Sequence, residues 1–402
     1  MKTITQNKQG LRILVAGTIL QLLLGIIYAW SVFVIPVSEA YQWDISAVKL
    51  MASFSLSFFA LGMLAGSKLL VKIGTEKTVF AGGTIFAAGM FASAFLPASI
   101  APLMYFTCGI ICGFGAGAAY KAITFASQKW FPQDRSFAYG ITICALGFSP
   151  VIFAPLVQFL VNQFDARNTF VIIAAVFFTA VLALFKFISL PETSPLPEKD
   201  LPVEKQYTVK EAVKTKEYFF IIVSLMFLTA AFFILNPSII TFTIERGLGN
   251  YTIGTIVVML FGAANALGRL VLPVFSQKAG REKILFAIAI TTAVCSAFLG
   301  IADGYLFIAG IVIIAFCFGG LPGIYAELTA DYFGSENAQS NYNAVIAGFA
   351  LSALAFPLLF SLIGDVRSQF LLLAALAASG GKFITLLALS KQRKNDLDEE
   401  RR

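Results

Sequence analysis

Arg269 lies inside an apolar stretch, FGAANALGRL (261–270), and its chemistry is the clearest in the chain. A guanidinium stays charged at physiological pH, and an arginine in the middle of a membrane helix nearly always faces a bundle interior or a wet cavity. Its fork of N–H groups can bind a carboxylate through two parallel hydrogen bonds. Asn265 comes four residues earlier on the same helix face, where it could bond the same ligand or Arg269 itself.

A carboxylate within the chain could also pair with Arg269, but no apolar stretch holds an Asp or Glu near its middle. Glu327 and Asp331 stand near the end of another stretch. A cation without an internal counter-charge predicts an external one, namely an anionic ligand. The chain contains no His, and it offers neither a metal cluster nor a nucleophile–base pair, so an enzyme is not expected.

The elements that carry these residues are predicted to be membrane helices. Hydrophobic residues make up 58% of the 402 residues, charged residues 13%, and the mean hydropathy is +0.83. A soluble domain holds about twice that share of charge, and a helix needs about 20 mostly apolar residues to cross a bilayer. Twelve such stretches are present, at 12–36, 47–68, 78–97, 101–127, 137–160, 168–190, 218–243, 252–276, 283–301, 305–330, 342–364 and 368–390.

The positive charges support this topology. With the N-terminus inside, the predicted outer segments hold only Lys49, Arg167, Arg246 and Arg367, and most other Lys and Arg residues fall on inner segments. This bias satisfies the positive-inside rule, places both termini in the cytoplasm and explains the net charge of +7 without nucleic acid. The first stretch exceeds the 7–15 apolar residues of a secretory signal, so we expect it to be retained in the cell (inner) membrane.

The chain is predicted to consist of two similar halves. The polar, proline-containing segment 191–217 separates six stretches from six, and 208–216 within it could form a short surface helix. LVKIGTEK (70–77) after the second stretch and SQKAGREK (276–283) after the eighth are offset by 206 residues, as are Gly62 and Gly268. Two parallel six-helix repeats joined by an inner loop are typical of one transporter architecture, whose halves rock around a central site.

Several motifs together resemble the major facilitator superfamily, and within it the oxalate/formate antiporter and bacterial monocarboxylate transporter branch. They are YAWSVFVIP (28–36), Tyr120 with KWFPQDRSFAYG (129–140), EAVKTKEYF (211–219), NALGR (265–269), DYFG (331–334) and NYN (341–343). The resemblance implies an all-α membrane protein of twelve transmembrane helices in two six-helix pseudo-symmetric halves. The expected domains are 1–190, a cytoplasmic linker 191–217, and 218–402 with a short cytoplasmic tail.

The resemblance also implies a set of substrate-binding residues. Arg269 matches the arginine that holds the substrate carboxylate, and Tyr120 is placed at the substrate as a phenol donor, although it could instead be a packed aromatic. Tyr28 is interpreted in the same way. Phe148 and Phe318 would form apolar walls if they face the cavity, and Phe349 is expected to shape the pocket for the substrate's tail.

The residues at positions 349 and 121 indicate how many carboxylate groups the substrate carries. Oxalate-exchanging members carry a lysine at the place of Phe349, and the stretch 342–364 holds no basic residue. One cation suits one carboxylate, because an uncompensated charge is costly in a low dielectric. Lys121 is the alternative second cation, but it could also extend to the inner surface or pair with Glu327.

The sequence therefore predicts a secondary transporter of small monocarboxylates such as lactate, pyruvate or formate, working by alternating access as a monomer. Proton-coupled symport would require either Glu327 as proton carrier or a proton carried with the substrate itself, whereas anion exchange requires neither. The alternatives are an oxalate/formate antiporter and, more remotely, a carboxylate-binding membrane sensor. No metal or cofactor is expected, because the five cysteines lie within apolar stretches without metal-ligand spacing.

The chain departs from the superfamily in its first inner loop. Relatives usually carry an Asp there, whereas this chain has Val71, and the second copy has Gln277. The gating interaction that this Asp provides is therefore expected to be weaker or missing. In the seventh stretch (218–243), the pair Asn236–Pro237 is expected to break the helix. Close helix packing is predicted for the fourth stretch (101–127) from the glycines at every fourth position, Gly109, Gly113 and Gly117.

Overall fold

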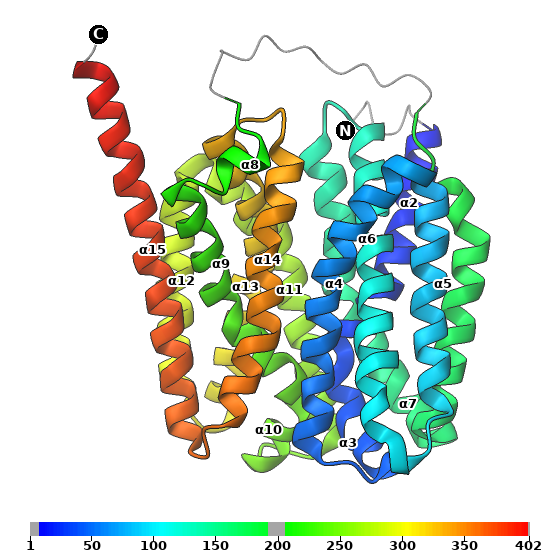
Figure 1. The fold of residues 1–402 in the computed structure, drawn as a ribbon. Helices are drawn as coiled ribbons and strands as arrows, with labels where there is room; N and C mark the ends of the chain where they lie inside the picture. Colours follow the sequence, from blue (N-terminus) through cyan, green and yellow to red (C-terminus); the bar gives the residue numbers. More distant parts are fainter. Residues whose placement is uncertain (1–7, 192–205, 401–402) are drawn as a thin grey trace. The chain divides into compact units, whose positions relative to one another are not determined.

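The computed structural model describes residues 8–191 and 206–400, which are helical and contain no strand. Within this part of the chain, ten helical segments are long and apolar enough to cross a membrane. They are Lys8–Tyr41, Ile45–Ile73, Ala98–Trp130, Phe137–Phe187, Lys216–Glu245, Tyr251–Ala279, Arg281–Leu299, Gly304–Phe333, Ala338–Ser361 and Val366–Gln392. The all-α membrane architecture is thus confirmed (Figure 1).

Two helices account for the difference between these ten segments and the twelve predicted spans. α5 (Thr75–Ala94) has 20 residues and falls at the third predicted span, but it is not among the ten. α7 (Arg135–Leu184) runs through the fifth and sixth spans without the expected loop, because only Asp165, with φ of 67°, interrupts its helical geometry. The Asp165 carboxylate accepts a hydrogen bond from the Asn168 backbone N–H at 2.9 Å. This N-cap starts the second part of α7 directly after Asp165.

The chain divides into two compact units. The first unit consists of the described parts of Met1–Asp200 together with Leu235–Ala266, and the second of Leu201–Ile234 together with Leu267–Arg402. α9 (Lys216–Leu235) and α11 (Tyr251–Ala279) therefore contribute to both. The halves expected from the sequence, 1–190 and 218–402, stay a prediction.

In the first unit, small residues bring α4 (Ile45–Ile73) and α6 (Cys112–Trp130) side by side (Figure 1). A Cβ atom at Gly113 would overlap the carbonyl oxygen of Ser55, and one at Gly117 would overlap that of Phe59. The predicted glycine steps of span 4 thus permit backbone-to-backbone packing, as in other membrane helix pairs.

The second unit is built around α13 (Gly304–Phe333), with α14 (Ala338–Ser361) and α12 (Arg281–Leu299) packed against it. α15 (Val366–Glu400) lies along α12. Here Gly268 of α11 fits against the backbone of Phe316 in α13, where a Cβ atom would overlap the Phe316 carbonyl oxygen. The short α8 (Val209–Ala212) starts at a capping box of Thr208 and Glu211 and is shorter than the predicted surface helix. The rest of the polar linker lies mostly outside the described residues.

Corresponding elements of the two repeats have matching local geometry. α4 and α11 both have 29 residues, and each ends at a glycine with positive φ, 86° at Gly74 and 99° at Gly280. Positive φ strains other residues, so a glycine at this turn has a backbone reason. The two sequence echoes at 70–77 and 276–283 therefore encode the same helix-ending turn.

Two transmembrane segments are each broken by a short 3-10 turn that belongs to the first unit. In the segment Lys8–Tyr41, η1 (Gly25–Ala29) separates α2 (Lys8–Leu24) from α3 (Trp30–Tyr41). In the segment Lys216–Glu245, η5 (Asn236–Ser238) separates α9 from α10 (Ile239–Glu245), at the Asn–Pro pair where the sequence predicts a break. The two turns lie against each other.

Candidate functional site

Arg269 lies on α11 with only 3% of its surface exposed. Asn265 precedes it by one helical turn and is 1% exposed. Burial of a permanently charged group in an apolar helix is costly unless a partner compensates it. The helix therefore holds a charged and a polar side chain on one face, as the sequence indicated.

Tyr120 lies on α6 in the first unit and is 4% exposed. Its phenol oxygen is 3.5 Å from that of Tyr139 on α7, and its ring packs at 5.1 Å from that of Phe59. The backbone carbonyl of Tyr120 accepts a hydrogen bond from Gln21 Nε2 at 3.3 Å. The phenol thus has a polar neighbour that sequence reasoning missed, because Tyr139 stands in a motif of the resemblance without an assigned role.

Lys121 follows Tyr120 on α6 and is buried, with 6% of its surface exposed. Its carbonyl accepts a hydrogen bond from Thr124 Oγ1 at 3.1 Å. Its burial does not favour the expectation that the side chain extends to the inner surface. A buried ammonium is consistent with an internal electrostatic role.

Tyr28 and Phe148 occupy different environments in the first unit. Tyr28 lies in η1 and is 3% exposed, so the broken segment of the first span carries it into the interior. Phe148 lies on α7 with 40% of its surface exposed. Its expected role as an apolar wall stays a prediction.

Four phenylalanines of the second unit form a cluster. Phe318 on α13 is stacked on Phe232 of α9, with ring centroids 3.5 Å apart and planes within 7°. Phe233 meets Phe349 of α14 edge to face at 4.7 Å, and Phe318 and Phe349 are 6.3 Å apart. The structure thus brings Phe318 and Phe349 close together. The neighbouring Phe232 and Phe233 had no sequence signal that separated them from the other phenylalanines.

Glu327 lies near the end of α13 in an ion-paired network. It binds Arg281 at 3.0 Å, and Gln277 Nε2 donates to its other oxygen at 3.0 Å. Arg281 also pairs with Asp331. The side chain of Glu327 is 24% exposed. Gln277, which replaces the Asp of relatives, therefore still joins α11 to α13, by a neutral hydrogen bond instead of a charge.

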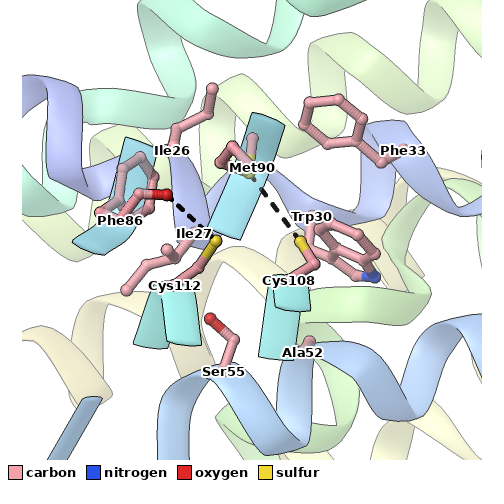
Figure 2. A pocket seen from close by; sticks show the side chains of 10 residues that line it. All are labelled: Ile26, Ile27, Trp30, Phe33, Ala52, Ser55, Phe86, Met90, Cys108 and Cys112. Atoms are coloured by element: carbon pink, nitrogen blue, oxygen red, sulfur yellow. Dashed lines mark hydrogen bonds between the residues drawn. The ribbon is translucent and has the colours of Figure 1, made fainter. Parts of the chain in front are cut away.

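A small pocket lies within the first unit (Figure 2). Its lining residues are Ile26, Ile27, Trp30, Phe33, Ala52, Ser55, Phe86, Met90, Cys108 and Cys112. Cys108 Sγ is 3.9 Å from Met90 Sδ, and Cys112 Sγ donates to the Phe86 carbonyl at 3.4 Å. None of the predicted substrate-binding residues lines this pocket. In the part of the chain that the structure describes, no three His, Cys, Asp or Glu side chains form a group that could hold a metal ion.

The comparisons with known proteins give the family. The family model of the Major Facilitator Superfamily matches residues 17–357. The chain belongs to this superfamily. It is a multi-pass membrane protein of a family of transporters, as the resemblance implied.

Three relatives within or near this superfamily are similar to the chain over different shares of its length. The chain is 27% identical to the MFS-type transporter YhjX of Escherichia coli (strain K12), over 84% of this chain and 84% of that one. It is 22% identical to the oxalate:formate antiporter of Oxalobacter formigenes, over 82% and 79%. It is 28% identical to monocarboxylate transporter 13 of Rattus norvegicus, over 42% and 40%, so this last match spans less than half of either chain.

Proposed function

We propose that the protein is a secondary transporter of small monocarboxylates, such as lactate, pyruvate or formate, that works by alternating access. The observation that carries the proposal is the buried Arg269 on α11. Its relatives include an oxalate:formate antiporter and monocarboxylate transporters, whose substrates are carboxylates. An arginine is suited to a carboxylate because its two parallel N–H groups match the two oxygens.

Each remaining site residue has a proposed role in this cycle. Tyr120 and Tyr28 donate hydrogen bonds to the anion, and Asn265 bonds the substrate or orients Arg269. Phe148, Phe318 and Phe349 are proposed as apolar walls for the rest of the substrate. The cluster of Phe318 with Phe349 supports this assignment for the second unit, since it offers an apolar surface to a short hydrocarbon tail.

Anion exchange is the coupling mode that the acidic residues support better. Symport with protons would assign the proton to Glu327, and protonation would remove the negative charge that pairs with Arg281. Exchange requires no such step. Both modes are compatible with a monomer in the cell membrane whose termini face the cytoplasm, which is the orientation that the positive charges favour.

An oxalate/formate antiporter is the second candidate, and the burial of Lys121 favours it. A dianion requires two compensating cations in a low dielectric. Lys121 would supply the second one. The absence of a basic residue in the stretch 342–364 supports the monocarboxylate instead.

The test is uptake of labelled lactate into proteoliposomes under two driving forces. One uses empty vesicles with an acidic exterior, and the other uses equal pH with unlabelled lactate inside. Uptake only in the second condition is expected for an exchanger, and uptake in the first would establish proton symport. No lactate uptake in either condition, with oxalate uptake against internal formate, would replace the monocarboxylate proposal by the second candidate.

A further inference from the structure

The turns η1 and η5 meet inside the first unit, and a hydrogen bond joins the segments that follow them. Ser31 Oγ on α3 accepts the backbone N–H of Ile240 on α10 at 2.9 Å. Both residues are buried. The N–H of Ile240 would bond to the Asn236 carbonyl in an unbroken helix. The serine therefore satisfies a donor that the helix break has released.

Further contacts hold the same segments together. The Tyr251 hydroxyl of α11 donates to the Val32 carbonyl of α3. The Lys49 ammonium of α4 lies 5.5 Å from the centre of the Phe242 ring of α10. We call this packing of η1, α3 and α4 on η5 and α10 the closed arrangement. All of these contacts stabilise it.

Asn236 has the opposite effect on the closed arrangement. Its side chain is fully buried in η5, and neither its Oδ1 nor its Nδ2 atom has a hydrogen-bond partner among the described residues. A buried amide without partners loses the hydrogen bonds that water would give it. This cost applies only while the amide is buried, because exposure to water restores its partners.

We propose that Asn236 acts as a counterweight: its buried amide destabilises the closed arrangement that the Ser31–Ile240 hydrogen bond stabilises. Asn236 and Ser31 together set how often the closed arrangement opens. This inference rests on the proposed alternating access, in which the first span must separate from the seventh to expose the site on the side of α3 and α10. The positive-inside rule places that side outside the cell. A transporter with an overly stable closed arrangement would cycle slowly, since populations follow the difference in free energy between its states.

Substitutions of Asn236 and Ser31 are predicted to shift the ratio of closed to open molecules in opposite directions. Asn236→Leu removes both unpartnered polar atoms at similar volume, so the ratio of closed to open molecules should rise roughly tenfold. Ser31→Ala leaves the Ile240 N–H without its acceptor, so the ratio should fall by roughly fivefold or more. Ser296→Ala is the matched control, because Ser296 Oγ on α12 is equally buried and unpartnered but lies in a regular helix of the second unit.

The measurement is the distance distribution between spin labels at Ser46→Cys and Leu248→Cys, both in the first unit, in a background whose five cysteines are replaced by alanine. We expect the short-distance fraction to rise in Asn236→Leu, to fall in Ser31→Ala and to stay unchanged in Ser296→Ala. Equal or same-sign changes in the first two variants would overturn the proposal.

Transport and distance readouts separate this inference from the proposed function. If the label distances shift in opposite directions while no monocarboxylate is transported, the counterweight stands and the substrate assignment fails. If lactate is exchanged but the distance distributions of all variants coincide, the substrate assignment stands and the counterweight fails. In a variant with both Asn236→Leu and Ser31→Ala, the population should return toward that of the native chain, which a general folding defect would not produce.

Discussion

Gly268 lies directly against the backbone of Phe316, and Gly62 repeats this relationship with Phe114 in the other repeat. The glycines are offset by 206 residues and their partners by 202. A Cβ atom at either glycine would overlap a carbonyl oxygen of the neighbouring helix. The close approach of α4 to α6 therefore has the same form as that of α11 to α13, as expected for the two predicted repeats.

This relationship predicts that Gly62→Ala and Gly268→Ala each destabilise the protein by about 1–3 kcal/mol, because backbones pressed together cannot move apart without losing packing. Gly364→Ala is the control, since no heavy atom lies within 4 Å of the added Cβ atom. Thermal unfolding in detergent, followed by size-exclusion chromatography, measures the difference. Equal stability of Gly268→Ala and Gly364→Ala would contradict the close approach.

Arg269→Lys is predicted to reduce monocarboxylate exchange by roughly 10-fold to 100-fold, because a lysine cannot reproduce the two parallel hydrogen bonds of the guanidinium. Arg367→Lys, at an exposed position in the first turn of α15, should leave exchange unchanged. Counterflow of labelled lactate compares the two at equal protein density. Normal exchange by the Arg269 variant would remove the residue on which the function proposal depends.

The sequence predicts the helices of this fold far better than the side-chain contacts between them. Apolar length located the spans, and the Asn236–Pro237 pair located the break, because both depend on local chain properties. The stacking of Phe232 on Phe318 could not be predicted. A helix that is apolar all round has no polar face to fix its rotation, so its sequence does not indicate which ring meets which.

In the candidate site, too, the sequence indicated the properties of single residues but not the contacts between helices. An arginine in an apolar stretch is conspicuous in the sequence, and its burial followed from the physics of charge in a membrane. The neighbour of the Tyr120 phenol, Tyr139, depends on how α6 and α7 pack. Pairing between helices of different spans is set by tertiary packing, and a single sequence carries no measure of it.

Tyr120→Phe is predicted to raise the KM for lactate about tenfold with a smaller effect on the maximal rate, because the phenol would donate a hydrogen bond to a charged group. Tyr139→Phe removes the neighbouring hydroxyl without removing the proposed donor. We expect it to raise KM by less than threefold. A larger effect of Tyr139→Phe than of Tyr120→Phe would transfer the donor role to Tyr139.

Lys121→Met should leave lactate exchange within about twofold of the native rate if the substrate is a monocarboxylate, since one carboxylate needs one cation. Oxalate should then compete poorly with labelled lactate in the native protein. Strong competition by oxalate that disappears in Lys121→Met would instead support the dicarboxylate alternative. Inhibition curves with oxalate and pyruvate, measured in parallel, distinguish these outcomes.

Glu327→Gln tests the coupling mode. The substitution removes the charge that pairs with Arg281 at 3.0 Å, but Arg281 keeps Asp331 as a partner. We therefore expect counterflow to persist within about twofold and stability to fall by at most about 1 kcal/mol, as for other partly exposed ion pairs. Asp331→Asn is the matched control, because it removes the other partner of the same guanidinium. If the Glu327 variant alone lost uptake driven by a pH gradient and kept counterflow, Glu327 would be the proton carrier and the protein a symporter, because counterflow exchanges anions without net proton movement.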